Sequence, residues 1–129
     1  MNQQNGVYYG QVKGKEKHGE GKLIKKIGGY EEIWEGQWKN DELHGKAYFK
    51  SNQEEYTGHF SQGLYNGYGE IEYASGATYK GEFCQGKFHG FGEYIDEQFW
   101  YKGGFRMGTK HGKGEFKNEK GDFYNGKFL

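Results

Sequence analysis

The stretch YKGEFCQGKFHGFG, residues 79–92, decides the fold because its pattern recurs along the whole chain. An aromatic residue, any residue and a glycine are followed nine residues later by a glycine, often with histidine before it and another glycine two places on. The pattern opens at Tyr8, Trp34, Tyr56, Tyr79 and Tyr101, and a half-copy opens at Tyr124. The intervals of 26, 22, 23, 22 and 23 residues indicate a repeat protein. Such an architecture offers an extended surface for partners rather than a pocket for chemistry.

Each copy reads as one β-hairpin. The copies run over residues 8–33, 34–55, 56–78, 79–100 and 101–123, with a partial copy over 124–129, and they predict a single domain over residues 1–129. In the third copy, the first strand alternates Tyr56, Gly58 and Phe60, and the second alternates Gly67, Gly69, Ile71 and Tyr73. Side chains alternate across a strand, so each set is expected on one face. The hairpin turns are expected at Ser61–Gly63 and Cys84–Gly86, and the links between copies at Ala74–Gly76 and Glu119–Gly121.

Glycines on the aromatic face are expected to leave hollows across which neighbouring rings can lie. The structural glycines predicted in this way are Gly36, Gly58, Gly67, Gly69, Gly81, Gly90, Gly92, Gly103, Gly112 and Gly114. A single hairpin is marginally stable, so the copies must support one another. The predicted fold is all-β: an elongated, single-layer antiparallel sheet of consecutive hairpins, twisted and grooved, with an aromatic face and a charged face.

Composition narrows the class of protein further. The chain has 25 Gly, no Pro and only 33% hydrophobic residues, but its 19% aromatic content at fixed spacing argues against disorder. The net charge is zero, yet residues 1–26 carry +4, residues 27–99 carry −8 and residues 100–129 carry +4. This distribution does not resemble the dominant basic stripe of a nucleic-acid-binding protein. Cys84 is alone, and Met1–Gly6 shows no secretory signal, so a cytoplasmic location is expected.

The pattern resembles the MORN repeat (membrane occupation and recognition nexus), which reads Tyr-x-Gly, then Gly, then His-Gly-x-Gly. The fullest matches are Tyr79-Lys80-Gly81 with Gly86 and His89-Gly90-Phe91-Gly92, and Tyr101-Lys102-Gly103 with Gly108 and His111-Gly112-Lys113-Gly114. The resemblance covers residues 8–128. The departures are Trp34 for the first Tyr, Asn66 for a His, Ala47 for a Gly, and Asp41 where the turn Gly belongs.

The resemblance implies an interaction role: scaffolds in cilia and the cytoskeleton, membrane tethers, or accessory modules of enzymes. We therefore expect a non-catalytic scaffold that binds an extended or helical segment of another protein subunit along an aromatic groove, in a cytoskeletal or ciliary (axonemal) assembly. The expected groove residues are Trp34, Trp38, Phe49, Tyr56, Phe60, Tyr73, Tyr79, Phe83, Tyr94, Tyr101, Phe105 and Phe116. The strand edge at 124–129 is a second expected contact, by self-association or capping.

A different hypothesis is a peripheral membrane module that binds acidic phospholipid headgroups. The basic ends of the chain favour it, and the acidic centre opposes it. A third possibility is the regulatory subunit of an enzyme located elsewhere.

No metal, cofactor or catalytic residue is expected. His18, His44, His89 and His111 share one slot of the repeat, but consecutive copies lie about 9–10 Å apart, whereas zinc ligands lie within about 2.1 Å of the metal. These histidines are instead expected to bind turn backbone, and His59 has no obvious partner. The GxxxxGK[ST] motif of nucleotide-binding loops is absent.

Overall fold

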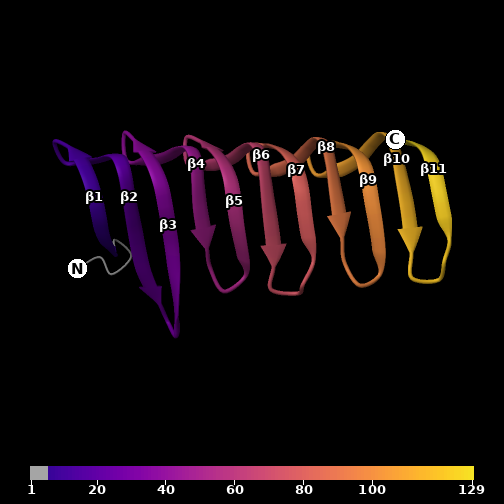
Figure 1. The fold of residues 1–129 in the computed structure, drawn as a ribbon, viewed down its shortest axis with the longest axis horizontal. Coiled ribbons are helices and arrows are strands. Elements are labelled where there is room, and N and C mark those ends of the chain that lie inside the picture. Colours follow the sequence, from indigo (N-terminus) through magenta and orange to yellow (C-terminus); the bar gives the residue numbers. More distant parts are fainter. Residues whose placement is uncertain (1–5) are drawn as a thin grey trace.

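The computed structural model describes residues 6–129 as one eleven-stranded antiparallel sheet, in which the strands follow one another in chain order (Figure 1). The strands are β1 (Val7–Lys13), β2 (Glu16–Ile27), β3 (Tyr30–Lys39), β4 (Glu42–Lys50), β5 (Glu54–Ser61), β6 (Leu64–Tyr73), β7 (Thr78–Cys84), β8 (Lys87–Ile95), β9 (Phe99–Arg106), β10 (Thr109–Asn118) and β11 (Phe123–Phe128). Residues 1–5, to which the expectation of no secretory signal mostly refers, lie outside the described residues.

The predicted fold class is confirmed: consecutive hairpins form an open, elongated, all-β array. The turn of the third hairpin lies at Gln62–Gly63, and the next link lies between Tyr73 and Thr78, close to where the glycine pattern predicts them. Over residues 6–129 the chain forms no helix capable of crossing a membrane.

Each of the five complete hairpins is bent, a feature that the sequence did not predict. In the third hairpin Gly58 pairs with Gly69, and Phe60 pairs with Tyr65. Between these two pairs the chain advances by two residues along β5 but by four residues along β6. The same irregularity follows Gly10, Gly36, Gly81 and Gly103 in the other hairpins. Such bulges kink a strand, and the ribbons in Figure 1 turn back at this level.

The bend divides every hairpin into two parts. We call the part between the bend and the links the long arm, and the part between the bend and the hairpin turn the short arm. Gly67, predicted as a regular strand glycine, lies in the bulge with φ +96°, a conformation that favours glycine. The long and short arms of successive hairpins together form a trough, with the aromatic residues on its inner face.

The core fills the angle between the two arms. Its buried members are Leu23, Trp38, Leu43, Ala47, Tyr56, Phe60, Ile71, Tyr79, Phe83, Tyr101 and Phe105. None of the buried residues between 6 and 129 is polar or charged except for the tyrosine hydroxyl groups. Aromatic burial therefore supplies most of the hydrophobic stabilisation, as the shortage of aliphatic residues requires.

Backbone hydrogen bonds between the turns of successive hairpins connect the copies to one another. The backbone N–H of Gly86 donates to the carbonyl of Tyr65 at 2.8 Å, and that of Gly108 donates to Phe88 at 2.8 Å. On the opposite side of the sheet, the link residue Ala74 donates to Gln53 at 2.8 Å. Bonds of the first kind connect each hairpin turn to the preceding one, and a second link-to-link bond is donated by Glu119 to Gln98, so the trough is a continuous surface.

Candidate functional site

In every copy that opens with a tyrosine, this tyrosine lies flat against its own hairpin. The hydroxyl of Tyr56 donates to the carbonyl of His59 at 2.8 Å, and Tyr79 and Tyr101 make the same bond to the residue three places on, each at 2.7 Å. Because the bulge interrupts the ladder at this point, the hydroxyl supplies a partner to a carbonyl at the bend. The motif's tyrosine therefore fixes the angle between the two arms.

Glycines beneath the ring make this position possible. A Cβ atom at Gly69 would lie 2.2 Å from the hydroxyl oxygen of Tyr56, and one at Gly58 would lie 2.8 Å from it. The same close approach is found at Gly81, Gly92, Gly103 and Gly114, whereas Gly36 faces Ala47. The remaining predicted structural glycines, Gly67, Gly90 and Gly112, have positive φ angles at the bend and do not lie beneath a ring.

Seven of the predicted groove residues are buried within the protein itself. Tyr56, Tyr79 and Tyr101 have no exposed surface, and the others are at most 7% exposed: Trp38, Phe60, Phe83 and Phe105. The expectation that these rings offer free edges to a partner is wrong. The short arm folds towards the long arm, and its aromatic residues contact the opening tyrosines edge-on, as Phe60 and Phe83 do on Tyr56 at 5.2 Å between ring centroids.

The accessible part of the trough belongs to a different set of residues. Trp34, Phe49, Tyr73, Tyr94 and Phe116 were predicted and are half-buried. Sequence analysis missed Leu64, Tyr65, Phe88 and Phe99, of which Leu64 is 50% exposed. Residues 65 and 88 occupy the same position of the repeat, a slot nine residues after the opening aromatic residue. The aromatic residues at this position could have been recognised from the sequence, but the analysis followed the glycine positions instead.

This slot covers the opening aromatic ring. Tyr65 stacks on Tyr56 with 3.8 Å between centroids, and Phe88 stacks on Tyr79 at 3.8 Å. In the outer copies the slot holds lysine instead, and Lys110 Nζ lies 5.4 Å from the centre of the Tyr101 ring, a cation–π distance. The trough thus exposes stacked rings in its middle and lysine heads towards both ends.

An apolar hollow opens between the second and third hairpins. It has a volume of about 250 Å³ and is lined by Trp34, Phe49, Phe60, Gly63, Leu64, Tyr65 and Gly86. A second aromatic group lies farther along the trough, where Phe99 packs against Tyr94 at 5.3 Å and against Phe116 at 5.4 Å. The hollow can hold one large apolar side chain, and the aromatic group provides a flatter surface beyond it.

The two long borders of the trough carry opposite charge. The tip rim comprises the five hairpin turns with two flanking residues on each side: residues 12–17, 38–43, 60–65, 83–88 and 105–110. It holds seven Lys or Arg and three Asp or Glu, a net charge of +4. The link rim comprises the links with the same flanks: residues 26–31, 49–55, 72–79, 94–100 and 117–124. It holds four Lys and eight Asp or Glu, a net charge of −4.

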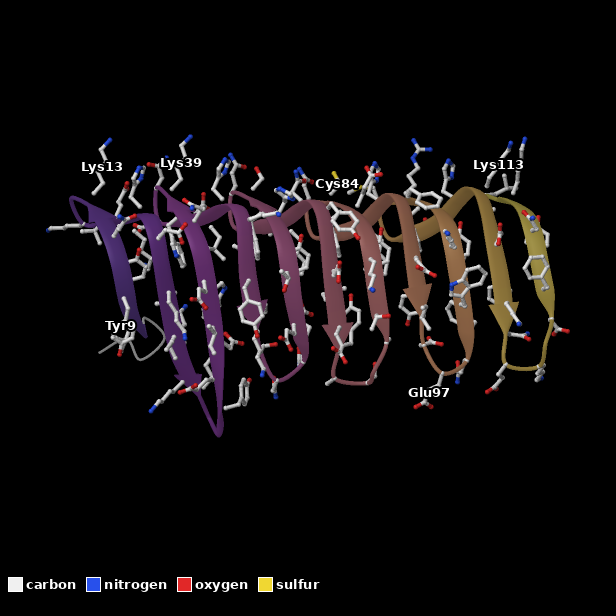
Figure 2. All side chains as sticks on the ribbon, viewed as in Figure 1. Tyr9, Lys13, Lys39, Cys84, Glu97 and Lys113 are labelled. Carbon is white, nitrogen blue, oxygen red and sulfur yellow. The ribbon has the colours of Figure 1, made fainter. Side chains whose placement is uncertain are left out.

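Figure 2 shows this separation, with Lys13 and Lys39 along one edge of the array and Glu97 along the other. The uneven charge that the sequence shows along the chain is therefore also a charge difference across the molecule. In an antiparallel sheet, successive connections lie at opposite ends of the strands. The hairpin turns therefore all lie at one end of the strands and the links at the other.

Burial and neighbouring carboxylates change the acidity of the trough tyrosines. Desolvation raises the pKa of Tyr73 to about 12, with a further contribution from the charge of Glu54. Desolvation also raises the pKa of Tyr65, whose hydroxyl donates to Glu54. Burial opposes ionisation of Asp96, yet backbone hydrogen bonds from Phe99 and Gln98 lower its pKa. The inner face therefore presents neutral phenols, and Asp96 stays ionised on the link rim.

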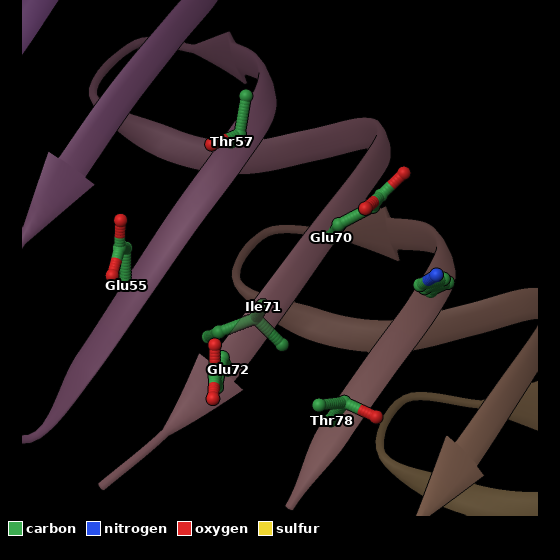
Figure 3. A pocket seen from close by; sticks show the side chains of 7 residues that line it. Glu55, Thr57, Glu70, Ile71, Glu72 and Thr78 are labelled. Carbon is green, nitrogen blue, oxygen red and sulfur yellow. The ribbon is translucent and has the colours of Figure 1, made fainter. Parts of the chain in front are cut away.

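The outer face of the long arms is polar and holds a separate hollow of about 210 Å³ (Figure 3). Glu55, Glu70 and Glu72 line it together with Lys80. Glu55 lies directly opposite Glu72, an unfavourable pairing of like charges. Two exposed aromatic side chains lie on the same outer face, Tyr68 in the third hairpin and Phe91 in the fourth.

The turn contact expected of the slot histidines is made by His89, whereas His18 Nδ1 is buried without a hydrogen-bond partner. His89 Nδ1 accepts a hydrogen bond from the backbone N–H of Met107 at 3.2 Å, and Asn66 Oδ1 accepts one from Gln85 at 3.2 Å in the equivalent place. His59, for which no partner was expected, has Nδ1 3.3 Å from the carbonyl of Tyr68. Within residues 6–129, no three His, Cys, Asp or Glu side chains gather as a metal site would require.

Comparison with known families agrees with this geometry. A family model of the MORN repeat matches the chain five times, at residues 8–30, 34–52, 56–78, 79–97 and 101–123. Each match begins at the aromatic residue that opens a copy and ends in the link that follows its hairpin or at the first residue of the next strand. No curated protein matches the chain.

Proposed function

The chain belongs to the MORN-repeat family, whose repeats are non-enzymatic modules for binding protein or lipid, and on this premise we propose that it is a scaffold that binds a segment of another protein along the trough. The observation that carries the proposal is the open apolar floor, in particular the hollow beside Leu64. Exposed apolar surface of this kind, bordered by polar rims, is typical of protein interaction sites.

The setting we propose is a larger cytoskeletal or ciliary assembly in the cytoplasm. This part of the proposal is supported by the roles associated with the family. An array in which each hairpin turn is hydrogen-bonded to the preceding one suits such a role, because it presents a preformed surface to a bound segment.

The test compares two substitutions that add the same charge to opposite faces. Leu64→Glu places a carboxylate in the hollow, and Tyr68→Glu places one on the outer face. Leu64 is 50% exposed and Tyr68 is 53% exposed, so both variants are expected to fold. We expect Leu64→Glu to lose the proteins that co-purify with the wild-type protein, while Tyr68→Glu keeps them. An unchanged set of partners for Leu64→Glu would contradict the proposal.

A second candidate function is binding to acidic phospholipids, which the net charge of +4 on the tip rim favours. Co-sedimentation with vesicles of phosphatidylserine and phosphatidylcholine at low and moderate salt tests it. Reversing tip-rim charge with Arg106→Glu should reduce pelleting if this function is correct. No pelleting of the wild-type protein at low salt would exclude it.

A further inference from the structure

The trough combines an apolar floor with two borders of opposite charge, and together these define the chemistry of its occupant. Resting on the proposed function, we infer that the bound segment is an amphipathic helix with acidic side chains on the flank facing the tip rim and basic side chains on the flank facing the link rim. The charges of the two rims also set the direction in which the helix lies along the array.

A helix fits the floor better than an extended segment does. Strands β2 to β10 each have a hydrogen-bonded neighbour on both sides, so their backbone groups are already occupied. An extended segment crossing them would leave its own N–H and C=O groups against an apolar surface without partners, which is costly. A helix satisfies these groups internally and can present an apolar stripe to the floor.

The spacing of the array also suits a helix. Two strands per copy give a spacing between hairpins of about 9.5 Å. Side chains seven residues apart on a helix are separated by about 10.5 Å along its axis. Each heptad can therefore contact one hairpin when the helix lies at a small angle to the long axis of the array. The hollow between the second and third hairpins can accept one large side chain from the apolar stripe.

Charge across the trough is most clearly separated around the link between the fourth and fifth hairpins. Lys87, Arg106 and Lys110 lie on the tip rim there, opposite Asp96 and Glu97 on the link rim. Arg106 and Glu97 are exposed and belong to neither the core nor the apolar hollow. Complementary charges at the border of an interface select partners and register more than they add affinity.

The rims fix direction because a helix is chiral. With its apolar stripe on the floor, a helix that has one acidic and one basic flank matches both rims in only one direction. Reversing the helix end to end places each flank against the rim of like charge. The trough can therefore hold its partner in a single orientation without any contact at the ends of the array.

The probe is a pair of designed helical peptides of three heptads with leucine at positions a and d. In the segregated peptide, glutamate occupies positions e and b and lysine occupies g and c; in the mixed peptide, the same residues alternate on both flanks. Fluorescence anisotropy at about 50 mM salt should show the segregated peptide binding about five- to tenfold more tightly. At about 1 M salt, where the screening length is about 3 Å, this preference should disappear.

A matched pair of double variants locates the effect. Arg106→Glu with Glu97→Lys keeps the net charge of the protein constant but lowers the tip rim from +4 to +2 and the link rim from −4 to −2, so it should weaken the preference for the segregated peptide. Glu70→Lys with Lys80→Glu makes the same exchange on the outer face and should keep it. Equal affinity of both peptides for the wild-type protein, or a preference that is undiminished in the rim variant, would overturn the inference.

Direction has its own readout. A nitroxide at the amino terminus of the segregated peptide should broaden amide resonances at only one end of the array; equal broadening at both ends would overturn the inference. Failure of the segregated peptide to bind would also overturn it. The proposed function would stand in each of these cases if Leu64→Glu still lost the natural partners, so the two claims fail separately.

Discussion

The opening tyrosine and the two glycines beneath it form the smallest unit on which the trough depends. Gly58 and Gly69 leave no side chain between the Tyr56 ring and the backbone, and the hydroxyl reaches the carbonyl at the bend. The ring is then covered by Tyr65 from above. Because contacts surround the ring on all sides, small changes of volume at this point should be felt strongly.

Replacement of a glycine beneath a ring should destabilise the protein. In Gly69→Ala the new methyl group would lie 2.2–2.4 Å from atoms of the Tyr56 ring, and we expect a loss of about 2–3 kcal/mol in the free energy of unfolding. Gly29→Ala is the control, because no atom lies within 4 Å of its Cβ position and we expect a change within about 0.5 kcal/mol. Urea denaturation followed by circular dichroism measures both. Equal effects would contradict the assigned role of Gly69.

Alkaline pH should destabilise the protein through its tyrosines. Burial raises the pKa of Tyr56 and Tyr79 above the ordinary value of about 10, and that of Tyr73 to about 12. Above pH 10 the unfolded chain loses these protons first, so their contribution to stability is complete below pH 10 and declines as pH rises towards 12. Thermal melts between pH 8 and pH 12 test this, with phenolate absorbance as the second signal. Constant stability from pH 10 to pH 12 would disprove it.

At the scale of the element, the hairpin turns contain residues in the left-handed conformation. Gln85 has φ +50° and Gly86 has φ +85°, and Gln62 and Met107 repeat the first of these positions in the hairpins on either side. Two consecutive positive φ angles define the turn that matches the twist of a two-residue hairpin. Glutamine and methionine are less suited to this conformation than asparagine is.

Optimising a turn should therefore stabilise the array. We expect Gln85→Asn to raise the free energy of unfolding by about 0.5–1 kcal/mol, since asparagine tolerates a positive φ. Gln98→Asn is the matched control, because Gln98 lies in a link and is not among the residues with positive φ. Chemical denaturation of both variants decides the point: a gain of the same size at position 98 would mean that the turn conformation is not the cause.

The hairpins were predictable from the sequence, but their bend was not. Alternation of Tyr56, Gly58 and Phe60 correctly predicts which residues share a face, and the glycine at position 63 correctly predicts the turn. The bend depends on a register shift between β5 and β6, in which Gly67 leaves the regular ladder. Strand periodicity counts residues along one strand and contains no information about pairing across two, so the bulge remained hidden.

The accessible residues of the trough were also difficult to predict, because strand periodicity does not report contacts between strands. Sequence alternation identified the aromatic face but not which of its rings lie beneath others, so Tyr56 and Tyr79 were predicted to be available although both are fully buried. Leu64 was missed because it lies beside the turn and belongs to no repeated aromatic position. Accessibility follows from the angle between the arms, which is a tertiary property.

At the scale of the whole molecule, neighbouring hairpins stabilise one another through shared rings. Phe128 packs edge-on against Tyr101 at 5.0 Å and against Tyr124 at 5.1 Å, so the last strand covers the tyrosine of the preceding hairpin. In such an array each unit contacts only its neighbours, and local damage should remain local.

Removing the Phe128 ring tests this coupling. We expect Phe128→Ala to cost about 1–2 kcal/mol, because the ring is half-buried, and to speed amide hydrogen exchange in β9 to β11. Exchange in β3 to β6 should change little. Uniform acceleration along the array would show instead that the sheet unfolds as one cooperative unit.

The central claim is that partners dock on the inner face of the trough and not on the outer face of the sheet. Hydroxyl-radical footprinting of the protein, alone and bound to a natural partner, tests it most directly, because it reports the accessibility of individual side chains. We predict reduced oxidation of Leu64, Tyr65 and Phe99, with Tyr68 and Phe91 unchanged. Protection of Tyr68 and Phe91 without protection of Leu64 would contradict the claim.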